Sequence, residues 1–216
     1  MTADREPPHV TCSLSDLVQR ARELITRDSR RLLGIAGAPG AGKSTLAAAL
    51  CAELGRDAAL VPLDGFHLSN EVLATLDLAA RKGAPETFDA DGFRSLLVRL
   101  RSREEPIVYA PEFHREIEQA VSGALPIARQ TPLVVVEGNY LLLDSGRWQG
   151  ITGLFDEVWY LALPGDTRVD RLIHRHQQHG RSANDAREWT LGNDERNAAT
   201  VEASAHRADL IITLTE

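Results

Sequence analysis

Short apolar runs alternate along this chain with segments in which apolar residues recur every three or four positions. An apolar run of about four to eight residues is typical of a buried strand, and the wider spacing is typical of an amphipathic helix. The runs predict strands at residues 32–36, 58–63, 133–136, 157–163 and 210–214. The wider spacing predicts helices at about residues 14–27, 44–54, 91–101, 167–179 and 186–205.

Strands and helices that alternate in this way predict an α/β fold, with a mostly parallel central sheet of about five strands flanked by helices. Neither a repeat nor a linker divides the 216 residues. We therefore expect a loose N-terminal tail at residues 1–11 and a single domain at residues 12–216.

Composition and charge narrow the functional classes. With 43% hydrophobic and 25% charged residues, the chain has the composition of a globular protein. A net charge of −7 disfavours nucleic acid as a partner. No apolar run approaches the roughly 18 residues that cross a membrane, and residues 1–10 lack the apolar stretch of a signal peptide. We expect a cytoplasmic protein that does not bind membranes, with reduced thiols at Cys12 and Cys51.

Residues 37–44 read Gly-Ala-Pro-Gly-Ala-Gly-Lys-Ser and match the phosphate-loop pattern G-x-x-x-x-G-K-[ST] between a predicted strand and a predicted helix. In such a loop, backbone N–H groups surround phosphate oxygens, the lysine adds positive charge, and the hydroxyl can bind Mg²⁺. Roughly 0.001 accidental matches are expected in a chain of this composition. The residues that we expect to hold ATP here are Gly37, Ala38, Pro39, Gly40, Ala41, Gly42, Lys43, Ser44 and Thr45.

Lysine is rare in this chain. Only Lys43 and Lys82 are lysines among 24 cationic residues, and the other 22 are arginines. Under such a bias, a position that keeps lysine is a good candidate for one that needs a compact ammonium group. Lys43 occupies the phosphate-loop position that requires lysine, and we expect it to be catalytic.

Two other predicted strands end in an acidic residue followed by glycine, at Asp64-Gly65 and Glu137-Gly138. Ligands of open parallel sheets bind beyond the carboxyl ends of the strands. Phosphoryl transfer needs Mg²⁺ next to the phosphates and a carboxylate that accepts or orients the proton of the attacking hydroxyl. The two acids are candidates for dividing these tasks, although Asp and Gly are also common turn residues.

Five segments, taken in order, give the chain a resemblance to a known group of kinases. They are the phosphate loop, Asp64-Gly65-Phe66-His67-Leu68, Thr87-Phe88-Asp89-Ala90-Asp91-Gly92-Phe93, Tyr109-Ala110-Pro111-Glu112-Phe113 and Val136-Glu137-Gly138-Asn139-Tyr140. Together they resemble the uridine kinase, phosphoribulokinase and bacterial pantothenate kinase superfamily, and most of all its nucleoside/nucleotide kinase-like proteins, some described as fructose-transport-system kinases. The resemblance covers about residues 30–214 and implies a P-loop NTPase fold with a helical lid.

The resemblance also implies roles for individual residues. Asp64 would be the general base that faces the acceptor hydroxyl, and Glu137 would, with Ser44, hold Mg²⁺ or its water. The residues that would bind the acceptor are His67, Asp89, Tyr109, His114 and Arg115.

Some residues depart from the uridine kinase pattern, and some have simpler interpretations. Uridine kinases usually have an aromatic residue in place of His67 and Asp-Phe in place of Ala110-Pro111, and their arginine would fall one position beyond Arg115. These departures disfavour a pyrimidine nucleoside. Asp89 could instead cap the helix that starts near residue 91.

The predicted helix at residues 167–179 carries Arg168, Arg171 and Arg175 within about 60° of one face. The break at Gly180-Arg181-Ser182 follows it. Resemblance to the lid of this superfamily implies a lid at about residues 175–187, with Arg175 catalytic and Arg181 bound to ATP. The alternative is a solvated arginine face.

We therefore expect an enzyme that transfers the γ-phosphate of ATP to a hydroxyl of a small metabolite, such as a nucleoside, a sugar or a pantothenate-like compound, with Mg²⁺. The alternative is a P-loop ATPase that switches a protein partner. Such a switch would not need a base and an acceptor-binding set such as Asp64, His67 and Asp89. A homodimer is left open.

Overall fold

The computed structural model describes residues 6–26 and 28–215 of the chain. Its strands and longer helices follow one another as β1 (His9–Cys12), α1 (Leu14–Leu24), β2 (Arg31–Ala36), α2 (Lys43–Leu54), β3 (Ala58–Pro62), α3 (Asn70–Thr75), α4 (Ala90–Ser102), β4 (Ile107–His114), β5 (Gln119–Ala128), β6 (Leu133–Glu137), β7 (Glu157–Leu161), α5 (Gly165–Gln178), α6 (Ala183–Trp189), a π-helix (Thr190–Asp194), α7 (Glu195–Glu202) and β8 (Leu210–Leu214).

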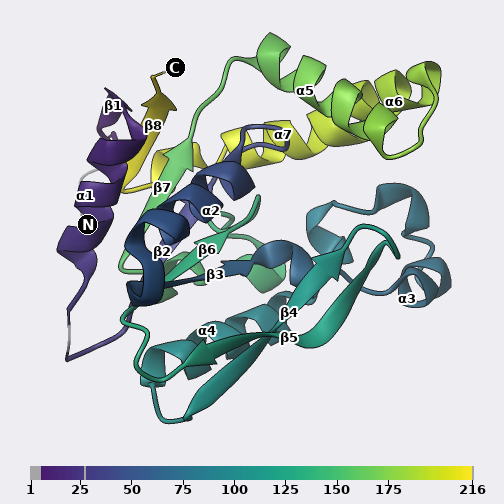
Figure 1. Ribbon diagram of the computed structural model, residues 1–216. Helices are drawn as coiled ribbons and strands as arrows, with labels where there is room; N and C mark the ends of the chain where they lie inside the picture. Colours follow the sequence, from purple (N-terminus) through teal and green to yellow (C-terminus); the bar gives the residue numbers. More distant parts are fainter. Residues whose placement is uncertain (1–5, 27, 216) are drawn as a thin grey trace.

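Six strands form a central sheet in the order β1-β8-β7-β2-β6-β3, and each neighbouring pair is parallel. β4 and β5 form a separate antiparallel hairpin (Figure 1). The structure thus confirms the predicted α/β fold with its parallel sheet and flanking helices. Among the described residues, no helix is long and apolar enough to cross a membrane.

The sixth strand, β1, lies in the segment that the sequence predicts to be a loose tail. His9–Cys12 pairs in parallel with β8, with Val10 opposite Ile212. Residues 9–11 therefore belong to the edge of the sheet, while residues 1–5 of the predicted tail, like the predicted helix end at Arg27, lie outside the described residues. The four residues of β1 contain no apolar run, and their partner strand is at the other end of the chain, so the local pattern could not predict this strand.

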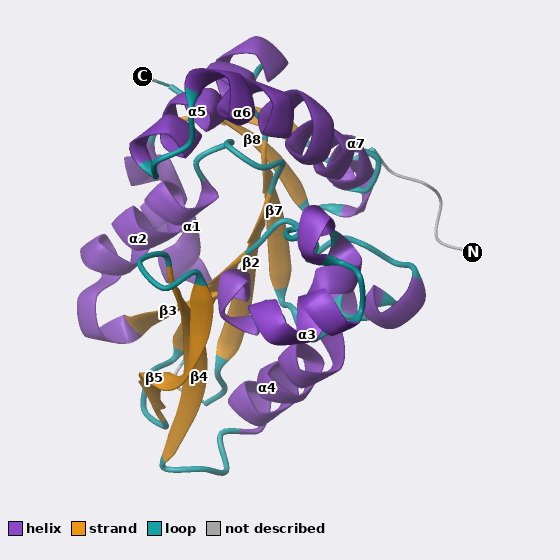
Figure 2. Ribbon diagram, turned by 90° about the vertical axis from the view of Figure 1, so that its right-hand side faces the viewer, coloured by secondary structure: helices purple, strands orange, loops and turns teal. Residues whose placement is uncertain are grey.

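The two faces of the sheet pack against different helices. Alternate residues of a strand point to opposite faces, so Leu33 and Ile35 of β2 pack against α1 and α2, while Leu32 and Ala36 belong to the core that includes α4. The predicted helix at residues 186–205 is divided by the π-helix. Figures 1 and 2 both show α5, α6 and α7 in the upper part of the view, and α3, α4 and the β4–β5 hairpin below them.

Candidate active site

The phosphate loop, residues 37–44, joins the carboxyl end of β2 to the first turn of α2. Gly40 has a φ of +82°, and a Cβ at this position would lie 3.0 Å from the backbone oxygen of Arg168 in α5. A residue without a side chain is therefore required both by the backbone conformation and by the close approach of α5. Lys43 is buried, and its Nζ donates a hydrogen bond to the Ala38 carbonyl at 3.1 Å.

Glu137 ends β6 beside the phosphate loop. It is paired in register with Ile35 of the neighbouring strand β2, and the Ser44 hydroxyl donates a hydrogen bond of 3.0 Å to its carboxylate. Burial, and next the negative charge of Asp64, raise the pKa of Glu137 to about 7, although Lys43 acts in the opposite direction. The positive charge of Lys43 therefore does not offset the effects of burial and of Asp64 on the Glu137 carboxylate. A buried carboxylate beside a hydroxyl is a suitable site for a cation.

Asp64 lies in the short helical turn Leu63–Phe66 that follows β3. Its side chain is 38% exposed, and Arg115 Nη2 lies 3.9 Å from Asp64 Oδ2. Because β3 and β6 are adjacent parallel strands, Asp64 and Glu137 are delivered to the same edge of the sheet. The structure thus brings together the two acids that the sequence singles out.

The glycine after each of these acids is required by packing. A Cβ at Gly65 would collide with the backbone oxygen of Pro111 in β4, and a Cβ at Gly138 would lie 2.5 Å from the Cβ of Leu63. The hairpin can therefore cross the end of β3 only because residue 65 has no side chain. The glycines of the Asp-Gly and Glu-Gly pairs therefore allow β4 to pack on Gly65 and Leu63 to pack on Gly138, in addition to forming turns.

His67 is fixed in a single orientation beside Asp64. Its Nδ1 lies 2.8 Å from the Asp64 carbonyl oxygen, and its ring packs on Phe88 (centroids 4.0 Å apart) and Phe113 (5.0 Å). Burial lowers the pKa of His67, which favours the neutral ring. Since a carbonyl only accepts hydrogen bonds, Nδ1 carries the proton, and Nε2 is left as an acceptor.

The two arginines that the sequence assigns to a lid, Arg175 and Arg181, come from α5 and the turn after it. Burial, and next the positive charge of Arg115, lower the pKa of Arg175. Arg181 stacks on Trp189 of α6, with its guanidinium carbon 4.1 Å from the ring centroid. Both arginines line the same cavity as Lys43.

The other two arginines of α5, Arg168 and Arg171, also lie beside the phosphate loop. Arg168 is buried and forms an ion pair of 2.7 Å with Glu195 of α7. Its Nη1 lies 3.5 Å from the Pro39 carbonyl, so this side chain connects the loop to α7. Arg171 lines a second cavity on the other side of the loop.

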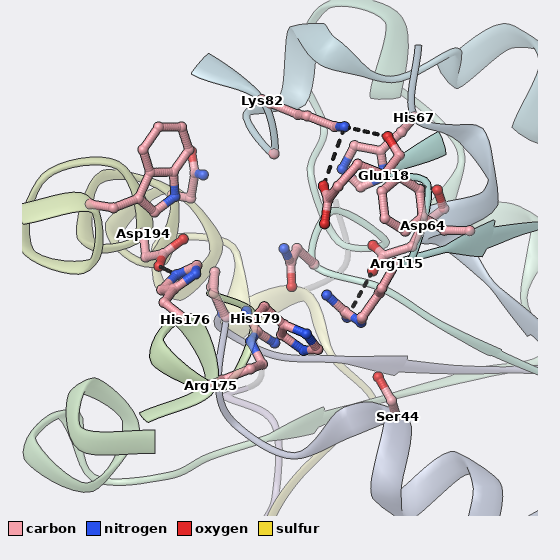
Figure 3. Close-up of a pocket in the computed structure, with 18 of the residues that line it drawn as sticks. Ser44, Asp64, His67, Lys82, Arg115, Glu118, Arg175, His176, His179 and Asp194 are labelled. Atoms are coloured by element: carbon pink, nitrogen blue, oxygen red, sulfur yellow. Dashed lines mark hydrogen bonds and ion pairs between the residues drawn. The ribbon is translucent and has the colours of Figure 1, made fainter. Parts of the chain in front are cut away.

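A cavity of about 540 Å³ connects these groups (Figure 3). Of the residues expected from the sequence, it is lined by Pro39, Gly40, Lys43, Ser44, Asp64, His67, Arg115, Glu137, Arg175 and Arg181. The second cavity, of about 680 Å³, is lined by Ala41, Gly42, Thr45 and further loop residues, with Leu14, Leu172 and Leu214 as apolar neighbours.

Three of the expected acceptor residues do not line either cavity. Asp89 is exposed and caps α4, where its Oδ1 accepts a hydrogen bond of 2.9 Å from the Gly92 N–H. Tyr109 is 54% exposed on β4. His114 ends β4, with its Nε2 3.5 Å from the Glu112 carboxylate. The capping interpretation therefore describes the position of Asp89, while the positions of Tyr109 and His114 suit the outer surface of the hairpin.

The structure adds residues that the sequence interpretation missed. Those that line the cavity and carry polar or aromatic groups are Lys82, Phe88, Phe113, Glu118, Asn139, His176, His179, Trp189, Asp194 and Asn197. Among them, His176 Nε2 lies 2.7 Å from Asp194 Oδ2, which joins α5 to the π-helix. Phe88, Phe113 and Asn139 lie in the motif segments that carry the resemblance, and Lys82 is one of two lysines, but the sequence interpretation assigned none of them to the site.

Comparison with known proteins identifies the family. The model of the phosphoribulokinase / uridine kinase family matches residues 32–216. The chain belongs to this family. It is 34% identical to a Schizosaccharomyces pombe protein described as a putative uridine kinase, over 98% of this chain and 94% of the relative. It is 30% identical to a pantothenate kinase of Enterococcus faecalis over 60% of this chain and 48% of that protein.

A solved structure supports the same conclusion. The putative fructose transport system kinase from Silicibacter sp. TM1040 superposes with a TM-score of 0.85 and 38% identity, over 92% of this chain and 98% of that one. The resemblance inferred from the sequence motifs is thus confirmed, and the chain is a P-loop protein of a kinase family.

Proposed function

We propose that this protein transfers the γ-phosphate of ATP to a hydroxyl group of a small metabolite. The observation that carries the proposal is that one cavity of about 540 Å³ is lined both by the phosphate loop and by Asp64, with His67 beside it. A nucleotide-dependent switch would not need a site for an acceptor next to the phosphates.

The nucleotide would lie across the phosphate loop. Lys43, Arg175 and Arg181 line the cavity at the phosphate end and would neutralise the charge of the transferring group. The second cavity continues along the loop, and its apolar residues Leu14 and Leu214 suit the base of the nucleotide.

Mg²⁺ would be held by Ser44 and Glu137. The donor set fits, because Mg²⁺ usually takes one or two protein oxygens together with phosphate oxygens and water. When bound, the ion would supply positive charge to the β- and γ-phosphates. The raised pKa of Glu137, caused first by burial, is consistent with a carboxylate whose partner is a cation.

Asp64 would act as the general base. In the proposed step, the acceptor hydroxyl oxygen forms a bond to the γ-phosphorus, the bond from this phosphorus to the bridging oxygen of ADP breaks, and the hydroxyl proton passes to Asp64. His67 Nε2 would accept a hydrogen bond from a neighbouring hydroxyl. Arg115, 3.9 Å from Asp64, would hold the base in place.

The test is an ADP-release assay against nucleosides, sugars and pantothenate, with the phosphorylated product identified by mass. Asp64→Asn should lower kcat by about 100-fold or more with little change in ATP affinity. Asp57→Asn is a matched control, because Asp57 is exposed at the opposite end of β3 and should leave kcat unchanged. ATP hydrolysis that no small acceptor stimulates, or an Asp64 variant as active as the Asp57 variant, would contradict the proposal.

A further inference from the structure

Lys82 is the second of the two lysines, and the proposed reaction leaves it without a role. It follows the short helical turn Ala79–Arg81 and lines the main cavity. Figure 3 shows its ammonium group on the same side of the cavity as His67 and Asp64, and on the far side from Arg175. An ammonium at this position faces the acceptor rather than the nucleotide phosphates.

The positive charge of Lys82 is poorly compensated by the protein. Its Nζ donates three hydrogen bonds, to Asn70 Oδ1 at 2.8 Å, to the backbone carbonyl of Glu118 at 2.6 Å and, at the longer distance of 3.5 Å, to the Glu118 carboxylate. The nearest carboxylate oxygen in its ion pair is Glu118 Oε2 at 3.5 Å, on a side chain that is 58% exposed. An ion pair to so exposed a partner contributes little. The Lys82 side chain itself is 17% exposed, so most of it is covered by the walls of the cavity.

The backbone around Lys82 is held in place. Asn193 of the π-helix is buried, and its Nδ2 donates to the Lys82 carbonyl at 3.0 Å. The next carbonyl, that of Gly83, accepts a hydrogen bond of 2.5 Å from the Tyr140 hydroxyl. A charged group that is fixed and partly desolvated in a cavity discriminates strongly between ligands, because a ligand of the wrong charge leaves it unpaired.

The ammonium lies close to the end of the cavity where the hydroxyl would react. Lys82 Nζ is 5.2 Å from the centroid of the Phe113 ring, and the His67 ring centroid is 5.0 Å from the same point. His67 in turn contacts the Asp64 carbonyl. One small molecule can therefore contact Lys82 at one end and Asp64 at the other.

We propose that the acceptor is a small hydroxy compound with an anionic group, a carboxylate or a phosphate, which Lys82 binds while the hydroxyl faces Asp64. The inference rests on the proposed function, and it narrows the acceptor from any polyol or nucleoside to an anion. A neutral polyol would leave the ammonium with the exposed Glu118 carboxylate as its counter-charge.

The test compares pairs of compounds that share a skeleton and differ in charge. Glycerate with glycerol and pantothenate with panthenol test the carboxylate, and ribose 5-phosphate with ribose tests the phosphate. For at least one pair, kcat/KM for the charged compound should exceed that for the neutral one by roughly tenfold or more, the effect of a hydrogen bond to a charged group. A neutral compound that equals or exceeds its charged partner in every pair would overturn the inference.

Variants separate a binding role of Lys82 from a structural one. Lys82→Gln keeps hydrogen-bond donors but removes the charge, so the preference for the charged compound should fall toward one while kcat/KM for the neutral compound changes little. Arg81→Gln, at an exposed neighbour of the same charge, and Asn70→Ala, which removes one contact of Lys82 but not its charge, should keep the preference. An equal loss for both compounds in Lys82→Gln would show a structural role and overturn the inference.

The inference and the proposed function fail in different ways. If no compound is phosphorylated, the proposed function fails. Calorimetric titration of the same pairs needs no turnover and still decides the inference: binding of the charged compounds that Lys82→Gln weakens roughly tenfold or more supports it, and binding without regard to charge overturns it.

Discussion

Asp89→Ala should destabilise the protein by about 1 kcal/mol without weakening acceptor binding. Asp89 Oδ1 accepts the Gly92 N–H at 2.9 Å at the start of α4, and a Cβ at Gly92 would collide with the other carboxylate oxygen, so the group sits directly over the first turn. Because Asp89 is exposed, its loss leaves no buried group unpaired apart from this N–H. Loss of a capping side chain costs about 0.5–2 kcal/mol, which for a domain of this size lowers Tm by about 2–4 °C per kcal/mol.

Asp89→Ser provides the matched control for this prediction. Serine caps helices about as well as aspartate, so this variant should keep the parent Tm, whereas Asp89→Ala should not. Thermal unfolding followed by circular dichroism measures the difference, and the KM for whichever acceptor the panel yields is measured in parallel. A tenfold rise of this KM in both variants, with Tm unchanged, would refute the capping role and show that Asp89 binds the acceptor.

Three further predictions concern the cavity itself. Lys43→Ala should abolish ATP turnover while the protein stays folded, since it removes the buried charge of the phosphate loop; turnover at the parent rate would disprove the loop assignment. Glu137→Gln should raise the Mg²⁺ concentration needed for half-maximal activity, whereas Asp64→Asn should not, and superimposable Mg²⁺ titrations would argue against this division of roles. Burial lowers the pKa of His67 in the folded protein, so the unfolded chain binds the proton more tightly, and the free energy of unfolding should decrease as the pH falls below about 6.5. His67→Phe should reduce this decrease in denaturant titrations at pH 7.5 and 5.5, and an unchanged slope would mean that His67 does not titrate in this window.

Much of the site at the sheet edge could be predicted from the sequence because its parts are local. The phosphate loop is eight consecutive residues whose conformation depends on its own glycines and on the helix that it opens. Asp64 and Glu137 each follow a recognisable apolar run, and all parallel strands present their carboxyl ends at one edge. The strand-end rule therefore placed both acids beside the loop without knowledge of the strand order.

The acceptor side of the cavity depended on the tertiary structure, because its residues come from segments that lie far apart in the chain. The hairpin of β4 and β5 includes Pro111 and Pro126 and has a bulge between Ala110 and Glu112, which interrupt its apolar segments, and its strands were not predicted. Without the hairpin, nothing in the sequence could bring Phe113 and Glu118 to Lys82.

Packing between distant segments also explains why Asp89 and Lys82 differ from what the sequence predicts. A motif determines which chemical group is available, but the side of a strand or loop on which it emerges depends on packing with distant segments. Asp89 matches an acceptor-binding motif, yet the start of α4 turns its carboxylate onto the helix and away from the cavity. Lys82 matches no motif, yet Asn193 and Tyr140, both more than fifty residues away in the chain, fix its backbone at the cavity wall. The sequence by itself determined the fold class and the nucleotide end of the site, whereas only the packing of the hairpin and the π-helix decided which side chains face the acceptor.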